Sequence, residues 1–246
     1  MKLKLKKCEF FKQAVKYLGH VISTEGVKPD DEKVEKIVNF PTPKSVKEVK
    51  TILGISSFYR KYIKGYSKIV EPLLEKTRSS YTKFHWDERD QKALDEIKKI
   101  LTTELLLLLP KFDLPFQIAS DASGHSLGAV LQQEQDGRVG PIAYASRRLT
   151  DEERRYTATE RELLSVIWSL KYFRKYFAGQ KEPVLILNDH RPLMWLTSMK
   201  EDEGRVGRWC NYLMSVNHKL VHKKGTEMGH ADTLSRIPLS DIKQAK

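Results

Sequence analysis

Four acidic residues occur where regular structure should begin or end, and together they could bind divalent metal ions. They are Asp121, Glu162, Asp189 and Asp232. Carboxylate oxygens are the ligands that Mg²⁺ prefers, and a pair of Mg²⁺ ions can hydrolyse a phosphodiester by activating water and neutralising the leaving oxygen. A single aspartate at a strand end is more often a turn or cap residue, so the prediction depends on the four acting as a set.

The rear half of the chain contains five segments that predict β-strands. Each is a run of alternating or continuous apolar residues bounded by turn residues. The segments are 115–121, 126–133, 141–147, 184–187 and 219–222. The fourth is apolar throughout, which favours a central, buried position in a sheet. Asp121 closes the first strand, and Asp189 follows the fourth, so both carboxylates stand at strand ends.

Helices are predicted between and after these strands. Thr157 and Glu160 match a capping box, and the helix that they start should end at Ala178 and Gly179. Glu162 lies near the beginning of this helix. Two shorter helices are predicted at 205–216 and 231–236, and the second contains Asp232. The order strand-strand-strand-helix-strand indicates a mixed α/β domain.

The front half of the chain predicts a hairpin followed by a mostly helical unit. Residues 1–27 alternate apolar and polar side chains around a turn at Glu25 and Gly26. A helix should begin after Asp30 and end before Pro41, and the next should begin at a capping box. That box consists of Ser45 and Glu48, and a third helix follows Trp86 and Asp87.

Charge points to a polyanionic partner. The formal net charge is +12, and residues 1–110 hold 23 Lys and Arg against 15 Asp and Glu. Aromatic residues alternate with these bases around residues 58–64, which suits a groove that follows a phosphate backbone. The alternative is a surface that is merely basic and solvated. The side chains expected to contact nucleic acid are Arg60, Lys61, Lys64, Arg205 and Arg208.

Several other classes of protein are disfavoured. The chain has no phosphate-binding loop of the GxxxxGK type. Cys8 and Cys210 form no closely spaced pair, which favours an intracellular protein, cytoplasmic or nuclear, over a secreted one. No apolar run is long enough to cross a membrane, so no membrane partner is expected. His218 and His222 would be about 13 Å apart on a strand, too far to share a zinc ion.

A series of short motifs carries a resemblance to one family. The front motifs include Cys8-Glu-Phe-Phe, Leu18-Gly-His-Val, Phe40-Pro-Thr-Pro and Phe58-Tyr-Arg-Lys-Tyr-Ile. The rear motifs include Asp121-Ala-Ser, Gly128-Ala-Val-Leu, Glu162-Leu-Leu, Asp189-His-Arg-Pro-Leu and Ala231-Asp-Thr-Leu-Ser-Arg. In this order they resemble the C-terminal part of the reverse transcriptase of gypsy-type LTR retrotransposons, including its ribonuclease H (RNase H) domain.

The resemblance implies a domain organisation and a fold. Residues 1–27 would be the end of the polymerase palm with its primer-grip hairpin, and 28–109 the thumb and connection. Residues 110–238 would be the RNase H-like domain, and 239–246 a tail. The expected fold is α/β, with an α+β front unit followed by a mixed five-stranded sheet flanked by helices. Because no Tyr-x-Asp-Asp motif is present, polymerase activity is not expected from this chain alone.

The resemblance also implies an activity, which is Mg²⁺-dependent hydrolysis of the RNA strand of an RNA/DNA hybrid. Asp121 would bridge two ions, for which Mn²⁺ could substitute, and Glu162, Asp189 and Asp232 would complete the site. Glu162 is preferred to Glu160 because family members place the ligand directly before a leucine. The implied partners are the RNA/DNA hybrid and the upstream polymerase domain of the same polyprotein. The alternative is a catalytically silent or host-adopted copy that only binds nucleic acid.

Overall fold

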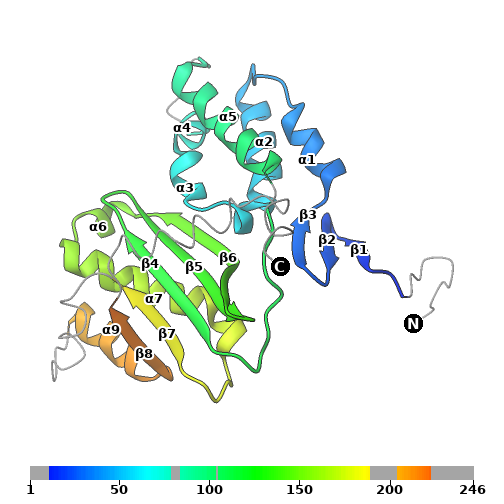
Figure 1. Cartoon of the computed structure of the whole chain (residues 1–246). Helices are drawn as coiled ribbons and strands as arrows, with labels where there is room; N and C mark the ends of the chain where they lie inside the picture. The colour runs from blue at the N-terminus through cyan, green and yellow to red at the C-terminus, as the bar shows by residue number, and fades with distance from the viewer. Residues whose placement is uncertain (1–10, 79–83, 104, 189–203, 223–246) are drawn as a thin grey trace, which may run out of the picture.

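The computed structural model describes residues 11–78, 84–103, 105–188 and 204–222 (Figure 1). These residues form two units. The front unit runs from β1 to α5, residues 14–102, and the rear unit contains the large sheet and its helices, residues 116–222. Each unit has a main hydrophobic core, and the core of the front unit also includes Tyr144 from the large sheet. No helix in the described part of the chain is long and apolar enough to span a membrane.

The front unit begins with a small antiparallel sheet. Its strands are β1 (Ala14–Tyr17), β2 (His20–Ser23) and β3 (Gly26–Pro29). The predicted hairpin is thus extended by a third strand, which Gly26 starts with φ of 145°. A Cβ atom on Gly26 would lie 2.3 Å from the carbonyl oxygen of Leu107, so glycine permits the close pairing of Val27 with Leu107.

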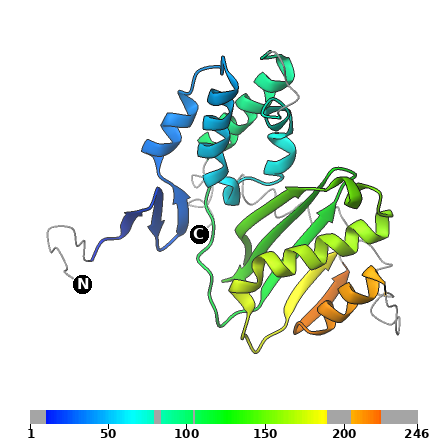
Figure 2. The same cartoon turned by 180° about the vertical axis from the view of Figure 1, so that it is seen from behind.

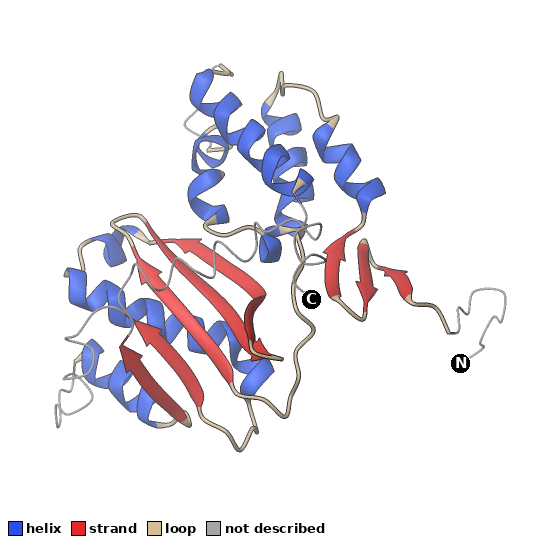
Figure 3. Ribbon diagram, viewed as in Figure 1, coloured by secondary structure: helices blue, strands red, loops and turns tan. Residues whose placement is uncertain are grey.

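Helices form the rest of the front unit (Figure 3). They are α1 (Asp31–Val38), α2 (Val46–Phe58), the 3₁₀ helix η2 (Arg60–Tyr62), α3 (Tyr66–Ile69), α4 (Glu71–Glu75) and α5 (Glu88–Thr102). Asp30, Ser45 and Asp87 cap α1, α2 and α5 as predicted. Only half of the predicted Ser45 box forms, because the Glu48 carboxylate accepts the N–H of Lys44 at 2.7 Å.

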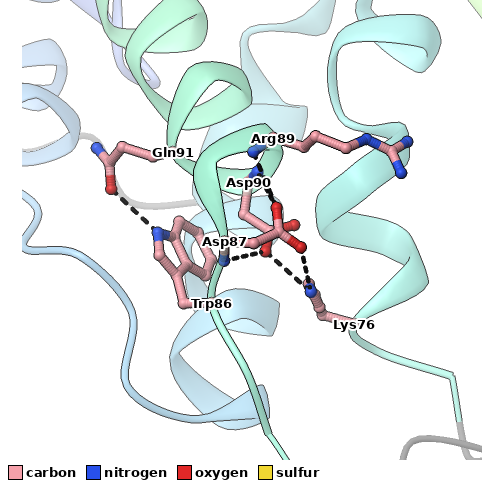
Figure 4. Close-up of polar contacts among 6 residues, drawn as sticks. All are labelled: Lys76, Trp86, Asp87, Arg89, Asp90 and Gln91. Carbon is pink, nitrogen blue, oxygen red and sulfur yellow. Dashed lines mark hydrogen bonds and ion pairs between the residues drawn. The ribbon is translucent and has the colours of Figure 1, made fainter.

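A buried cluster of charged residues links the end of α4 to the start of α5 (Figure 4). Lys76, only 3% exposed, lies 3.1 Å from Asp87 and 3.0 Å from Asp90. Asp90 is 1% exposed and also accepts the backbone N–H of Asp87 at 2.9 Å. The same aspartates form the capping box of α5, so the helix start and the ion pairs stabilise one another.

The rear unit is a five-stranded mixed sheet in the order β6-β5-β4-β7-β8. Its strands are β4 (Phe116–Ala122), β5 (Ser126–Gln135), β6 (Arg138–Arg148), β7 (Val184–Asn188) and β8 (His218–His222). β4, β5 and β6 form an antiparallel meander, whereas β7 runs parallel to β4 and to β8. The predicted α/β class and the five predicted strands are confirmed.

Two helices cover one face of this sheet (Figure 2). They are α7 (Ala158–Phe177) and α9 (Arg205–Met214), and the short α6 (Asp151–Arg154) precedes α7. Phe116, Ile118 and Leu131 of the sheet pack against Leu170 and Phe173 of α7. The predicted helix 231–236 lies outside the described residues.

Candidate active site

Asp121 lies near the end of β4, the middle strand of the sheet. Its Cα partner on β5 is Gly128, and its side chain is exposed. The preceding residues Phe116 and Ile118 are fully buried against α7. Because these neighbours are buried, β4 is held firmly in the sheet. The Asp121 carboxylate is therefore exposed to solvent on a rigid strand.

The first turns of α7 lie against the end of β4 and the loop that follows it. Ser165 of α7 donates a hydrogen bond to the hydroxyl oxygen of Ser120 at 3.1 Å, and both side chains are buried. A Cβ atom on Gly124 would lie 3.7 Å from the guanidinium of Arg161. Since Glu162 lies between Arg161 and Ser165, the structure brings the backbone around Glu162 next to the segment that carries Asp121. Glu162 is half-buried, and its Oε2 atom is shielded from solvent.

Glu160, the competing acid, is engaged in local contacts. Its Oε2 atom accepts the N–H of Thr157 at 2.9 Å and the Thr157 hydroxyl at 3.0 Å. Its Oε1 atom accepts from the guanidinium of Arg205, which holds the pKa of the Glu160 carboxyl below its usual value. The predicted capping role of Glu160 is confirmed. The assignment of Glu162 as the metal ligand stays a prediction.

Arg205 forms contacts that were not predicted from the sequence. Its guanidinium lies 3.7 Å from the ring centroid of Tyr156 and pairs with Glu160, so it joins the start of α9 to the start of α7. A signal was present, because an arginine in the first turn of a helix is unfavourable next to the positive end of the helix dipole. Such a position favours a carboxylate partner nearby.

Two of the four predicted metal ligands, Asp189 and Asp232, lie outside the described residues. The pairing of β4 with β7 reaches Ala119 and Leu187, and β7 ends at Asn188, the residue that precedes Asp189 in sequence. Among the residues that the structure describes, no three or more His, Cys, Asp or Glu side chains group as a metal site. The four-carboxylate site therefore stays a prediction. The described residues include two of its four ligands, Asp121 and Glu162.

The residues predicted to contact nucleic acid occupy two regions. Arg60 and Lys61 belong to η2, Lys64 lies just beyond it, and Arg60 and Lys64 are exposed. Arg208 is exposed on α9, whereas Arg205 is engaged by Glu160 and Tyr156. Contact of these residues with nucleic acid stays a prediction.

The strand order and the placement of α7 define a class of domain. Residues 111–216 match the family of RNase H-like domains found in reverse transcriptase. The structure is similar to foamy viral protease-reverse transcriptase in complex with RNA/DNA hybrid, with a TM-score of 0.76 and 24% identity. That match covers 90% of this chain and 30% of the other. At this identity the likeness shows the fold.

Relatives extend the match to nearly the whole chain. It is 38% identical, over 98% of its length, to the retrovirus-related Pol polyprotein from transposon 297 of Drosophila melanogaster, of which it covers 22%. It is 35% identical, also over 98%, to that from transposon gypsy of the same organism, of which it covers 24%. The chain thus spans about a quarter or less of these relatives. The resemblance to gypsy-type Pol polyproteins is confirmed.

Proposed function

We propose that this chain hydrolyses the RNA strand of RNA/DNA hybrids in a Mg²⁺-dependent reaction at the end of β4. The observation that carries the proposal is the contact between Ser120 and Ser165, which holds the Glu162 turn of α7 beside the Asp121 segment of β4. Supporting it, Glu160 is committed to Thr157 and Arg205, which leaves Glu162 as the helix carboxylate for the site.

The donor set suits magnesium. Asp121 and Glu162 supply hard oxygen ligands, and Asp189 and Asp232 are the further ligands that we propose. Bound at these carboxylates, two Mg²⁺ ions, or Mn²⁺ in their place, would activate the attacking water and neutralise the leaving 3′-oxygen. The protein's own contribution is to hold the carboxylates on rigid elements, with Asp121 on a central strand and Glu162 on the longest helix of the rear unit.

The chain would act as part of a longer polyprotein. Its relatives are Pol polyproteins of which it covers a minor part, so we propose that a polymerase domain lies upstream in the natural product. Residues 28–109 would then be its thumb and connection. Their basic excess would hold the hybrid by its phosphates while the rear unit cuts.

Cleavage of a labelled RNA/DNA hybrid by the full chain tests the proposal. We expect Mg²⁺-dependent cutting of the RNA strand, abolished by Asp121→Asn and reduced about a hundredfold or more by Glu162→Gln, because each removes a charge from a metal ligand. Glu160→Gln is the matched control, two residues away, and should retain most of the activity at saturating Mg²⁺.

Two outcomes would contradict the proposal. Cutting that survives Asp121→Asn would exclude the mechanism. Tight hybrid binding without cleavage in either Mg²⁺ or Mn²⁺ would support a copy that only binds nucleic acid.

A further inference from the structure

Two helices from different units meet beside the edge strand β6. η2 of the front unit packs on β6, and Arg60 of η2 donates a hydrogen bond to the hydroxyl of Tyr172 on α7 at 3.4 Å. Lys175, one turn further along α7, is close enough to Lys61 for its charge to disfavour protonation of that lysine. We call the surface formed by Arg60, Lys61, Lys171, Tyr172 and Lys175 the basic seam.

The cations of the basic seam have no carboxylate partner among the residues that the structure describes. Within the described part of the chain, none of the four forms a salt bridge. Three contact aromatic rings instead: Lys61 lies 5.1 Å from the ring centroid of Tyr62, Lys175 lies 5.2 Å from that of Tyr176, and Lys171 lies 4.9 Å from that of Tyr212. An aromatic ring orients a cation without cancelling its charge.

The fold places several positive charges near one another here. Burial lowers the pKa of Lys61, and the nearby charge of Lys175 lowers it further. Lys171 and Lys175 are both exposed and one helical turn apart, so they add their charges on neighbouring positions of α7. An anionic ligand would relieve this repulsion.

We propose that the basic seam is a nucleic-acid phosphate site that spans the two units, with α7 contributing Lys171 and Lys175. A duplex backbone fits the seam because its phosphates form a regular row of charges that can meet several cations at once. The exposed side chain of Tyr172, at 38%, accepts the hydrogen bond from Arg60 and favours nucleic acid over an acidic peptide, because aromatic and basic side chains together suit sugars, bases and phosphates. Binding of phosphates at the basic seam does not depend on cleavage activity. None of the residues of the basic seam is a proposed metal ligand.

The test measures binding of the full chain to a labelled RNA/DNA hybrid over a series of salt concentrations. Asp121→Asn is present in every sample, so that the substrate stays intact and failure of the proposed cleavage does not affect the result. The double variant Lys171→Gln, Lys175→Gln should bind the hybrid about tenfold more weakly at low salt. The slope of log Kd plotted against log salt concentration should fall by about two.

Lys33→Gln with Lys36→Gln is the matched control, because both lysines are exposed on α1 and the same two charges are lost. It should change the salt slope by clearly less than the α7 pair. Equal effects of the two pairs would overturn the proposal, since only general charge would then matter. Because Lys171 and Lys175 are exposed, both variants should keep the wild-type circular dichroism spectrum. The single change Lys175→Gln, with an expected slope change of about one, repeats the test if the double variant misfolds.

Discussion

Residues around the start of α7 have different roles in the proposed site. Glu160 is held by Thr157 and Arg205, whereas Glu162 lies in the turn that Ser165 anchors to β4. Arg205 contacts Glu160 and Tyr156, and we assign it a positioning role. Its contact with Glu160 and its stacking on Tyr156 keep the first turn of α7 in place.

Arg205→Gln should raise the Mg²⁺ concentration needed for half-maximal cleavage about tenfold, because residues that support metal ligands affect metal affinity by roughly this amount. The rate at saturating Mg²⁺ should change little. Cleavage rates measured across a Mg²⁺ titration check the prediction, and Arg208→Gln, on the same helix and exposed, should leave the Mg²⁺ requirement unchanged. A lower saturating rate with an unaltered Mg²⁺ requirement would contradict a positioning role.

Local sequence signals set where individual helices and strands begin and end. Most of these boundaries could be predicted. The predicted capping box of Thr157 and Glu160 forms, and the predicted helix start at Asp87 is completed by a capping box with Asp90. The Glu48 carboxylate turns to the N–H of Lys44 instead, a choice between neighbouring donors that sequence spacing does not determine. The buried partnership of Asp90 with Lys76 likewise depends on how α4 and α5 pack.

Lys76→Met should lower the free energy of unfolding by about 3–5 kcal/mol, because it leaves the buried Asp90 carboxylate without its cation. Urea denaturation at neutral pH measures the change. Adding Asp90→Asn should recover part of the loss, since the uncompensated charge is then removed. Lys92→Met, at an exposed pair with Glu88, should stay within about 1 kcal/mol of the wild type. A Lys76→Met protein as stable as this control would show that the cluster is not stabilising.

At the scale of the whole molecule, the front unit covers β6, the edge strand of the large sheet. Tyr144 of β6 is 6% exposed and belongs to the core of the front unit. The N–H of Ser67 donates to Ser146 at 2.9 Å, and Arg148 pairs with Glu71 at 2.8 Å. Covering an edge strand prevents it from pairing with other chains. It also fixes the front unit relative to the proposed active site.

Tyr144→Ala should cost about 3–4 kcal/mol of stability, because it leaves a cavity in a core that both units share. Hydrogen exchange should report faster amide exchange in α5 and in β6 together. Tyr144→Phe keeps the ring and should cost only about 1 kcal/mol. If exchange quickens in β6 alone, the two units do not unfold cooperatively.

The sequence by itself determined the five strands of the large sheet, the longer helices and the candidate carboxylates, because strand alternation, helix caps and acidic motifs are encoded within a few neighbouring residues. Tertiary structure decided which of these residues meet. Arg205 reaches Glu160 across 45 positions, and Arg60 reaches Tyr172 across 112. No local pattern specifies such pairs, since they arise only when α9 packs beside α7 and the front unit covers β6. The same packing sets Glu160 apart from Glu162 and gathers the cations of the basic seam.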